Sequence, residues 1–289
     1  MTPAAFEVHT LAVHAEDGHR SELLACVSDS PRASLLWLPA LGVAARHYLP
    51  FAEALAARGI AVFLHEWRGH GSSSLRAARD CDWGYRTLLC TDLPAAEAAV
   101  DTALPGRPRI VGGHSLGGQL ACCRLAIAPM PASRLWLVAS GAPWWRAFPA
   151  PRRYVLPLVY RFLPWLAARR GALPGRAIGF GGNEARGLIA DWARTGLSGR
   201  YAAAGLETDL EARLRDVDVD ATAVVMAQDW LGPEPSLRFL LDKLGSGHRA
   251  QVTTLDAEML GTRADHFAWM RTPAAVAAVL AGPFGHFDD

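Results

Sequence analysis

The chain has 289 residues, of which 51% are hydrophobic and 20% are charged, so it can bury a large core, and extended disorder is excluded. Its net charge of +1 provides no overall field that would attract nucleic acid or a membrane surface. Partners must therefore be inferred from local features, and we expect no nucleic acid among them.

The cysteines and the N-terminal residues favour a soluble protein of a reducing compartment. There are five cysteines, an odd number, and their spacing is that of neither a zinc site nor a redox pair. Residues 1–7 lack the basic start and apolar core of a signal peptide, and no apolar run of about eighteen residues predicts a membrane span. Of the 29 basic residues only Lys243 is a lysine, a bias typical of a GC-rich genome. We expect a cytoplasmic, bacterial protein.

Apolar periodicity predicts the elements of the first half of the chain in order. Two alternating segments, 6–15 and 21–28, predict antiparallel strands joined around Asp17-Gly18. Regular alternation follows: strand 34–38, helix 47–58, strand 60–64, helix 92–103, strand 110–111, helix 116–128 and strand 135–139. Such alternation builds a mostly parallel sheet with helices on both faces.

This alternation stops at Gly141-Ala142-Pro143 and resumes near residue 219. Residues 143–218 are rich in proline, tryptophan and arginine, and we interpret them as an inserted helical cap. The core then comprises residues 1–142 and 219–289. Its second part is predicted to contain strand 223–227, helix 236–244, strand 251–255 and a final helix 274–280.

The most informative motif is Gly113-His114-Ser115-Leu116-Gly117, which lies between a predicted strand and a predicted helix. A sharp strand-to-helix turn exposes a serine hydroxyl, and it requires small residues two positions before and after the serine. In a chain with 27 glycines the pattern can also arise by chance, as an ordinary glycine-rich loop. The flanking strand and helix favour Ser115 as a nucleophile, with Gly113 and Gly117 forming the elbow.

A serine nucleophile requires a base and a carboxylate that orients this base. His266 lies between the last predicted strand and the last predicted helix, in a loop that can return to Ser115. For the acid we choose Asp229, which follows strand 223–227. The rival carboxylates are Asp218, Asp220 and Asp256.

Two backbone N–H groups are expected to bind the oxyanion of an acyl-transfer reaction. One belongs to Leu116, directly after the serine, and the other is assigned to Leu41 in the loop Pro39-Ala40-Leu41-Gly42. No metal or other cofactor is expected. The pair His65 and His70 resembles a zinc motif, but the two histidines are five positions apart rather than four, and the neighbouring glycines oppose a single helical face.

Together these motifs resemble the α/β-hydrolase superfamily over most of the chain, the cap excepted, with the order serine, acid, histidine. The segment Glu66-Trp67-Arg68-Gly69-His70-Gly71-Ser72-Ser73 is similar to the loop after the fourth strand in that superfamily. Through Trp192-Ala193-Arg194 the chain also resembles a little-characterised bacterial branch of predicted serine hydrolases. It departs from its relatives at Pro39-Ala40, where they often have His-Gly, and at Glu66, where they usually have Asp.

The resemblance implies a serine hydrolase that cleaves a carboxylic ester or thioester through an acyl-enzyme on Ser115, with Asp229 and His266 completing the triad. Three other functions remain open: an acyltransferase with the same triad, an aminopeptidase-like amide hydrolase and a non-catalytic ligand-binding descendant.

The first part of the predicted cap, residues 143–183, holds seven arginines and no acidic residue, interleaved with aromatic residues. This composition predicts a lid over an acyl pocket for a small-molecule substrate. Its guanidinium groups would meet an anionic head group or, in peripheral contact without insertion, a lipid surface. The alternative is an ordinary packed lid, whose arginines reach water or pair with Glu207, Asp209 and Glu211. The oligomeric state stays open.

Overall fold

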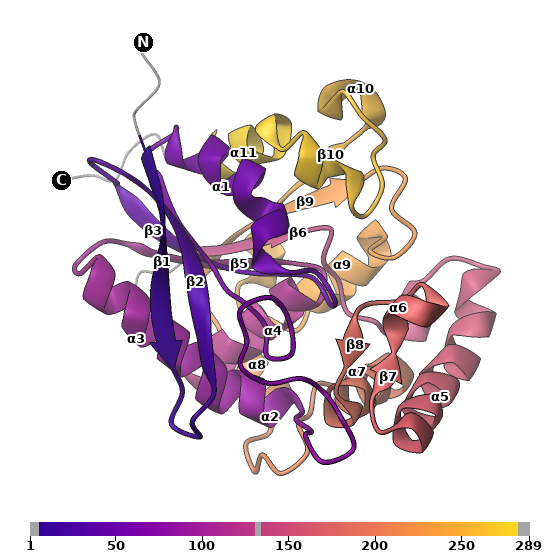
Figure 1. Ribbon diagram of the computed structural model, residues 1–289. Coiled ribbons are helices and arrows are strands. Elements are labelled where there is room, and N and C mark those ends of the chain that lie inside the picture. Colours follow the sequence, from indigo (N-terminus) through magenta and orange to yellow (C-terminus); the bar gives the residue numbers. More distant parts are fainter. Residues whose placement is uncertain (1–5, 131–133, 283–289) are drawn as a thin grey trace.

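The computed structural model describes residues 6–130 and 134–282, and within them the chain is built around an eight-stranded sheet (Figure 1). The strands of this sheet are β1 (Phe6–His14), β2 (Arg20–Ser28), β3 (Ala33–Leu38), β4 (Ile60–Leu64), β5 (Arg109–His114), β6 (Arg134–Val138), β9 (Asp220–Met226) and β10 (Gln251–Leu255). They lie in the order β1-β2-β4-β3-β5-β6-β9-β10. The pairs β1-β2 and β2-β4 are antiparallel and the pairs from β4 onward are parallel, so the predicted fold class is confirmed.

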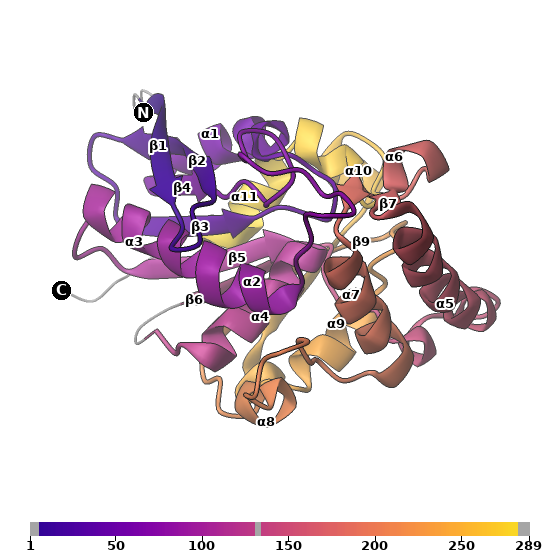
Figure 2. The same cartoon turned by 60° about the horizontal axis from the view of Figure 1, so that its bottom comes forward.

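Helices cover both faces of the sheet (Figures 1 and 2). On one face lie α1 (Leu49–Ala56) and α11 (Ala274–Ala281), and on the other α3 (Leu93–Ala103), α4 (Leu116–Ile127) and α8 (Leu210–Leu214). The shorter or more peripheral helices are α2 (Tyr85–Thr87), α9 (Glu234–Leu241) and α10 (Ala257–Leu260).

The side chains of the buried strands point alternately to the two faces of the sheet, which explains why there is a hydrophobic core on each face. Leu35 and Trp37 of β3 belong to the hydrophobic core beneath α1 and α11, whereas Leu36 and Leu38 belong to the core beneath α3 and α4. All four side chains are at most 1% exposed. Successive side chains of a strand point to opposite faces, so a strand that is apolar at every position is buried on both sides.

The segment between β6 and β9 lies beyond the carboxyl ends of the parallel strands (Figures 1 and 2). It contains α5 (Arg152–Arg170), the small antiparallel pair β7 (Leu173–Pro174) and β8 (Asn183–Glu184), α6 (Gly175–Ile178) and α7 (Arg186–Ser198). Helices α5 and α7 pack together around a small cluster of their own, which includes Leu163 and Ile189. By contrast, α8 packs on α4 of the core. The limits 143 and 218 of a separate cap domain stay a prediction.

Within residues 6–130 and 134–282, none of the helices combines the length and the apolar character that crossing a bilayer requires.

Candidate active site

Ser115 occupies a strained turn between β5 and α4. Its backbone angles are φ 54° and ψ −119°, and a positive φ is uncommon for a residue with a side chain. Two contacts from the end of β6 hold the turn: the Ser115 N–H donates to the Val138 carbonyl oxygen at 3.2 Å, and the Ser140 hydroxyl donates to the Ser115 carbonyl oxygen at 2.7 Å. The neighbouring strand therefore fixes the backbone that presents the serine hydroxyl.

The two glycines expected in this turn have no room for a side chain. A Cβ atom at Gly113 would lie 2.3 Å from the Gly117 carbonyl carbon, and one at Gly117 would lie 2.0 Å from the Leu38 carbonyl oxygen. Such distances are far below van der Waals contact. The turn from β5 into α4 thus brings three backbone segments together and requires glycine at both positions.

Asp229 and His266, the predicted acid and base, lie in contact. The Asp229 Oδ2 atom lies 2.7 Å from His266 Nδ1, and Asp229 Oδ1 accepts the backbone N–H groups of Leu231 at 2.8 Å and Gly232 at 3.0 Å. Both residues are buried, with 6% of the surface of each exposed. When the carboxylate accepts a hydrogen bond from Nδ1–H, the Nε2 atom keeps its lone pair, which is the arrangement of a general base.

The rival carboxylates lie elsewhere. Asp218 is an exposed residue that pairs with Arg249, and Asp220 is the exposed first residue of β9. Asp256 caps α10, where its side chain accepts the Met259 N–H at 2.9 Å. Asp218 and Asp256 thus have other partners, and Asp220 lies at the opposite end of β9 from the Asp229 loop.

Two N–H groups beside Ser115 are free to bind an oxyanion. In the described part of the chain, neither Leu41 nor Leu116 donates its backbone N–H to an acceptor, and both residues line the same cavity as Ser115. The Ala40 N–H, by contrast, donates to the Tyr48 hydroxyl oxygen at 2.9 Å. Of the two adjacent groups of this loop, the one at Leu41 is therefore available.

A buried hydrogen-bond chain connects the loop after β3 with the serine turn, and sequence reasoning missed it. Tyr48 accepts the Ala40 N–H, which leaves its own hydroxyl hydrogen for His114 Nδ1, 2.8 Å away. Burial lowers the pKa of His114 well below its usual range, and the neighbouring His266 lowers it further. His114 is thus neutral, and its ring lies 4.7 Å, centroid to centroid, from that of His266.

The loop that follows β4 is held by a buried ion pair and by a contact between a histidine and a carboxylate. Arg68 Nε donates to Asp92 Oδ2 at 3.0 Å, and His70 Nε2 lies 3.2 Å from Glu184 Oε1 of β8. His65 lies against the ring of Trp67, with 4.7 Å between ring centroids. Among the residues described, no three histidine, cysteine or acidic side chains come close enough together to hold a metal ion.

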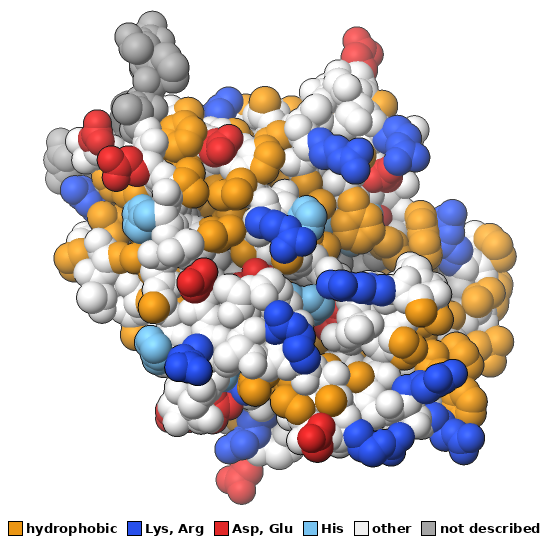
Figure 3. Space-filling model, viewed as in Figure 1, with side chains coloured by type: hydrophobic (Ala, Val, Ile, Leu, Met, Phe, Trp, Pro, Cys, Tyr) orange, Lys and Arg blue, Asp and Glu red, His pale blue; other side chains and the backbone are white. Residues whose placement is uncertain are grey.

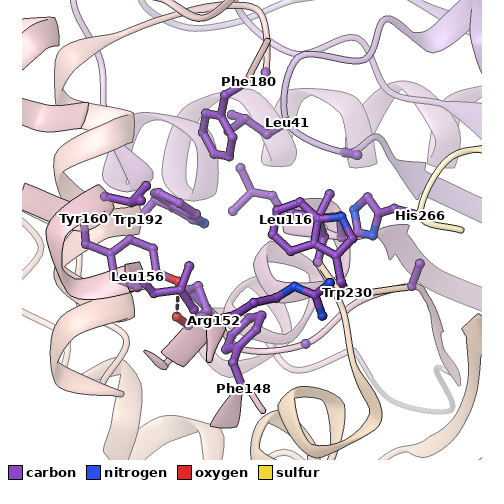
Figure 4. Close-up of a pocket in the computed structure, with 18 of the residues that line it drawn as sticks. Leu41, Leu116, Phe148, Arg152, Leu156, Tyr160, Phe180, Trp192, Trp230 and His266 are labelled. Atoms are coloured by element: carbon purple, nitrogen blue, oxygen red, sulfur yellow. Dashed lines mark hydrogen bonds between the residues drawn. The ribbon is translucent and has the colours of Figure 1, made fainter. Parts of the chain in front are cut away.

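Ser115 and His266 line a cavity of about 490 Å³. Figure 4 shows His266 at the side of this cavity. The following residues form much of its wall: Phe148, Leu156, Tyr160, Phe180, Trp192 and Trp230. Most of these come from the segment between β6 and β9, so this segment supplies much of the apolar surface, and it also contributes Arg152. The core supplies Ser115 and His266. An apolar cavity with a few convergent polar groups is the usual form of a small-molecule site.

Comparison with known proteins identifies the family. Residues 29–250 match the model of a family described as serine aminopeptidase, S33. Among solved structures, the esterase domain of a Rhodothermus marinus protein is 15% identical, with a TM-score of 0.61 over 96% of this chain and 97% of that one. A hydrolase from Pseudomonas aeruginosa is 20% identical, with a TM-score of 0.58 over 97% and 99% of the two chains. The thioesterase domain from the curacin biosynthetic pathway is 21% identical, with a TM-score of 0.58 over 96% and 99%.

At these identities the solved structures share the fold, and the family match covers most of the chain. The chain therefore belongs to the serine aminopeptidase S33 family of the α/β-hydrolase superfamily, and it is a hydrolase.

Proposed function

We propose that the protein hydrolyses carboxylic esters or thioesters of small acyl groups through an acyl-enzyme on Ser115, with His266 as the base and Asp229 as the residue that orients it. The observation that carries this proposal is the 2.7 Å contact between Asp229 and His266 beside a cavity that Ser115 also lines. An esterase domain and a thioesterase domain are among the proteins of similar fold.

In the first step, His266 Nε2 takes the proton of the Ser115 hydroxyl as its oxygen attacks the substrate carbonyl carbon. The imidazolium that forms is stabilised by the Asp229 carboxylate, which two backbone N–H groups hold in place. The N–H groups of Leu41 and Leu116 bind the negative charge on the carbonyl oxygen.

Collapse of this tetrahedral species expels the alcohol or thiol, which receives the proton from His266. Water then attacks the acyl-enzyme with His266 again as the base, and the carboxylic acid and Ser115 are released. The neutral His114 ring adds no positive charge next to His266, so it does not oppose proton transfer to this base.

The charge of the cavity favours ester or thioester substrates over aminoacyl amides. An aminopeptidase must bind the ammonium group of its substrate, for which a carboxylate is the matching partner. Among the described residues that line this cavity none is aspartate or glutamate, and the charged side chain at its wall is Arg152. The cavity is therefore suited to an apolar acyl chain and repels an ammonium group.

Two experiments test this proposal together. The purified protein is treated with a fluorophosphonate probe, and it is then assayed with matched ester, thioester and amide substrates of one acyl group. We expect labelling at Ser115 and faster turnover of ester or thioester than amide. Absence of labelling in folded protein would favour a non-catalytic ligand-binding role, and preference for an aminoacyl amide would favour an aminopeptidase.

An acyltransferase with the same three residues differs only in the acceptor that attacks the acyl-enzyme. Product analysis in the presence of competing alcohols and thiols separates the two reactions, since a hydrolase yields mainly the free acid. Predominant formation of the transferred ester or thioester would contradict the proposed hydrolysis.

A further inference from the structure

The arginines of residues 143–183 have no carboxylate partners among residues 6–130 and 134–282. This segment contains seven arginines, and in the described part of the chain none of them forms an ion pair with an acidic side chain. Two of the acids expected as partners are engaged elsewhere: Glu211 lies 2.9 Å from Lys243, and Asp209 lies 4.0 Å from Arg200. The positive charge of the segment is thus left for other partners.

Of these arginines, only Arg152 lines the cavity over Ser115. Arg146 lies over the ring of Trp145, 5.0 Å from its centroid, whereas Arg153 and Arg161 donate hydrogen bonds to nearby backbone carbonyl groups. Arg152 is also the one lysine, arginine, aspartate or glutamate among the described residues that line this cavity. A single guanidinium without a carboxylate partner therefore lies at the edge of a mostly apolar cavity, on a residue that is itself exposed.

The indole of Trp230 holds this guanidinium in place. The Arg152 Cζ atom lies 5.3 Å from the centroid of the Trp230 ring, a cation–π contact. Trp230 directly follows Asp229, so the contact joins the first residue of α5 to the loop that carries the carboxylate. Figure 4 shows the Arg152 side chain extending across the cavity toward Trp230, with Phe148 below it and His266 beyond. A guanidinium held in this way loses little conformational entropy on binding an anion.

We propose that Arg152 is the recognition site for an anionic group on the substrate, a carboxylate or a phosphate several bonds from the scissile carbonyl. The inference rests on the proposed ester or thioester hydrolysis and narrows its substrate class. The apolar wall binds the alkyl part, and Arg152 binds the charged end, for which guanidinium offers two parallel N–H donors. The contact with Trp230 is a cation–π contact and not a hydrogen bond, so it leaves the N–H donors of Arg152 available to an anion.

The anion has two chemical sources that the experiment must distinguish. It lies at the far end of the acyl group, as in the monoester of a dicarboxylic acid, or on the leaving alcohol or thiol, as in a phosphorylated thiol. Two substrate pairs separate these sources. The first is 4-nitrophenyl pentanoate with the 4-nitrophenyl monoester of glutaric acid, and the second is S-butanoyl pantetheine with its 4′-phosphate.

The test compares kcat/KM within each pair for the wild-type protein, Arg152→Gln, Arg152→Lys and a matched control, Arg161→Gln, which changes an exposed arginine of the same helix. We expect the wild type to prefer the charged member of one pair by about tenfold at low ionic strength, and we expect salt to reduce this preference. Arg152→Gln should abolish the preference and Arg152→Lys should keep part of it. Arg161→Gln should behave like the wild type.

Two results would overturn the inference. One is a wild type that does not prefer the charged member of either pair. The other is a loss in Arg152→Gln that is equal for the charged and neutral members, which would mean that Arg152 only packs the lid against Trp230. Failure of the proposed function is recognised separately, as absence of any turnover. In that case calorimetric binding of the same pairs to Ser115→Ala, with and without Arg152→Gln, still decides whether Arg152 recognises the anion.

Discussion

The hydroxyl oxygen of Tyr48 lies 2.8 Å from Nδ1 of His114, and it also accepts the N–H of Ala40 at 2.9 Å. One fully buried side chain thereby connects the loop that carries Leu41 to His114, the last residue of β5, directly before Ser115. The relative position of the nucleophile and of one N–H group of the proposed oxyanion site depends on this hydroxyl.

Replacement of Tyr48 by phenylalanine should destabilise the protein and slow the reaction. It leaves the Ala40 N–H and His114 Nδ1 buried without partners, and each unpaired group costs about 1–3 kcal/mol. Urea unfolding measures the loss, and kcat for a reactive ester should fall severalfold because the Leu41 loop is less firmly held. The control is Tyr154→Phe, since Tyr154 is 67% exposed. Equal unfolding free energies for the two variants would contradict a structural role of the hydroxyl.

Replacement of Asp229 by asparagine should reduce kcat by about 10⁴-fold, because the amide favours the wrong tautomer of His266 and does not stabilise its protonated form. Steady-state ester hydrolysis measures the change, with circular dichroism as the check of folding. The matched control is Asp218→Asn, at a side chain that is 70% exposed and paired with Arg249. If Asp229→Asn retained nearly full turnover while Asp218→Asn lost it, the acid would be misassigned.

We expect His65 to make the stability of the folded protein sensitive to acid. Burial lowers the pKa of this fully buried histidine from 6.5 to about 4, so below pH 6.5 the unfolded chain binds a proton that the folded chain does not. The free energy of unfolding should therefore fall by about 1.4 kcal/mol per pH unit as the pH drops from 6.5 toward 4, and this contribution is fully present above pH 6.5.

Urea unfolding between pH 7 and pH 4.5 measures this dependence. We expect His65→Leu to reduce the slope of the unfolding free energy against pH by about 1.4 kcal/mol per pH unit, the contribution of one proton. His9→Gln, at an exposed histidine of β1, serves as the control and should leave the curve unchanged. A variant at position 65 with the wild-type slope would show that the ring is protonated in the folded protein.

The apolar wall of the cavity should produce a dependence on acyl chain length. Burial of each methylene group is worth about 0.8 kcal/mol, which corresponds to about a fourfold rise in kcat/KM per added group until the cavity of about 490 Å³ is filled. A series of 4-nitrophenyl esters from acetate to decanoate measures this. Trp192→Ala removes an indole from the wall and enlarges the cavity, so it should shift the optimum to longer acyl chains. A flat series would mean that the acyl group does not enter the cavity.

Besides the wall of the cavity, the outer face of α5 is an apolar surface. We propose that this face binds peripherally to a membrane that contains anionic lipid. Tyr154, Leu158, Phe162 and Trp165 are 51–67% exposed, whereas Tyr160 and Leu163 face inward. Figure 3 shows hydrophobic and basic side chains mixed on the side of the molecule where α5 lies. Apolar side chains among unpaired arginines match a membrane of anionic lipid.

Co-sedimentation with vesicles of phosphatidylglycerol and of phosphatidylcholine tests this proposal. We expect binding to the anionic vesicles that is weakened by salt and by the double change Leu158→Ser and Phe162→Ser, but not by Met259→Ser on α10, a residue that is 58% exposed. Equal binding of the double variant would exclude this surface. Self-association of the wild type that the double variant loses, measured by ultracentrifugation, would assign the surface to a second copy instead.

Much of the fold follows from the sequence because buried parallel strands are apolar at every position. The strand predicted over 60–64 coincides with β4, in which all five residues are apolar and buried, whereas the strand predicted over 110–111 is longer and runs through His114. Gly112 and Gly113 have no side chain to signal a strand. They are in the strand because the backbones of β5 and β6 approach closely there: a Cβ at Gly112 would lie 2.5 Å from the Trp136 carbonyl oxygen.

Boundaries are less predictable where local turns compete with helix. The helix predicted over 47–58 begins later, at Leu49, after a 3₁₀ turn over Ala45–Tyr48. Pro50 in its first turn fits this start, since proline is tolerated there without loss of a hydrogen bond.

In the candidate site, some residues are indicated by the sequence, whereas others are recognised only from the folded structure. Chain order and spacing favour Ser115, Asp229 and His266 as the candidate triad, because the fold places the loops after late strands at one edge of the sheet. Their catalytic roles stay a prediction. The contact of Arg152 with Trp230 and the role of Tyr48 depend on tertiary packing of residues far apart in the sequence. No local pattern marks such residues.

The most direct test is mass spectrometry of the protein quenched during turnover of 4-nitrophenyl butanoate. Nucleophilic catalysis by Ser115 predicts a burst of nitrophenol and a butanoyl group on the peptide that contains Ser115, both absent from Ser115→Ala. Turnover that continues in Ser115→Ala, or an acyl group attached to a different residue, would contradict the proposed mechanism.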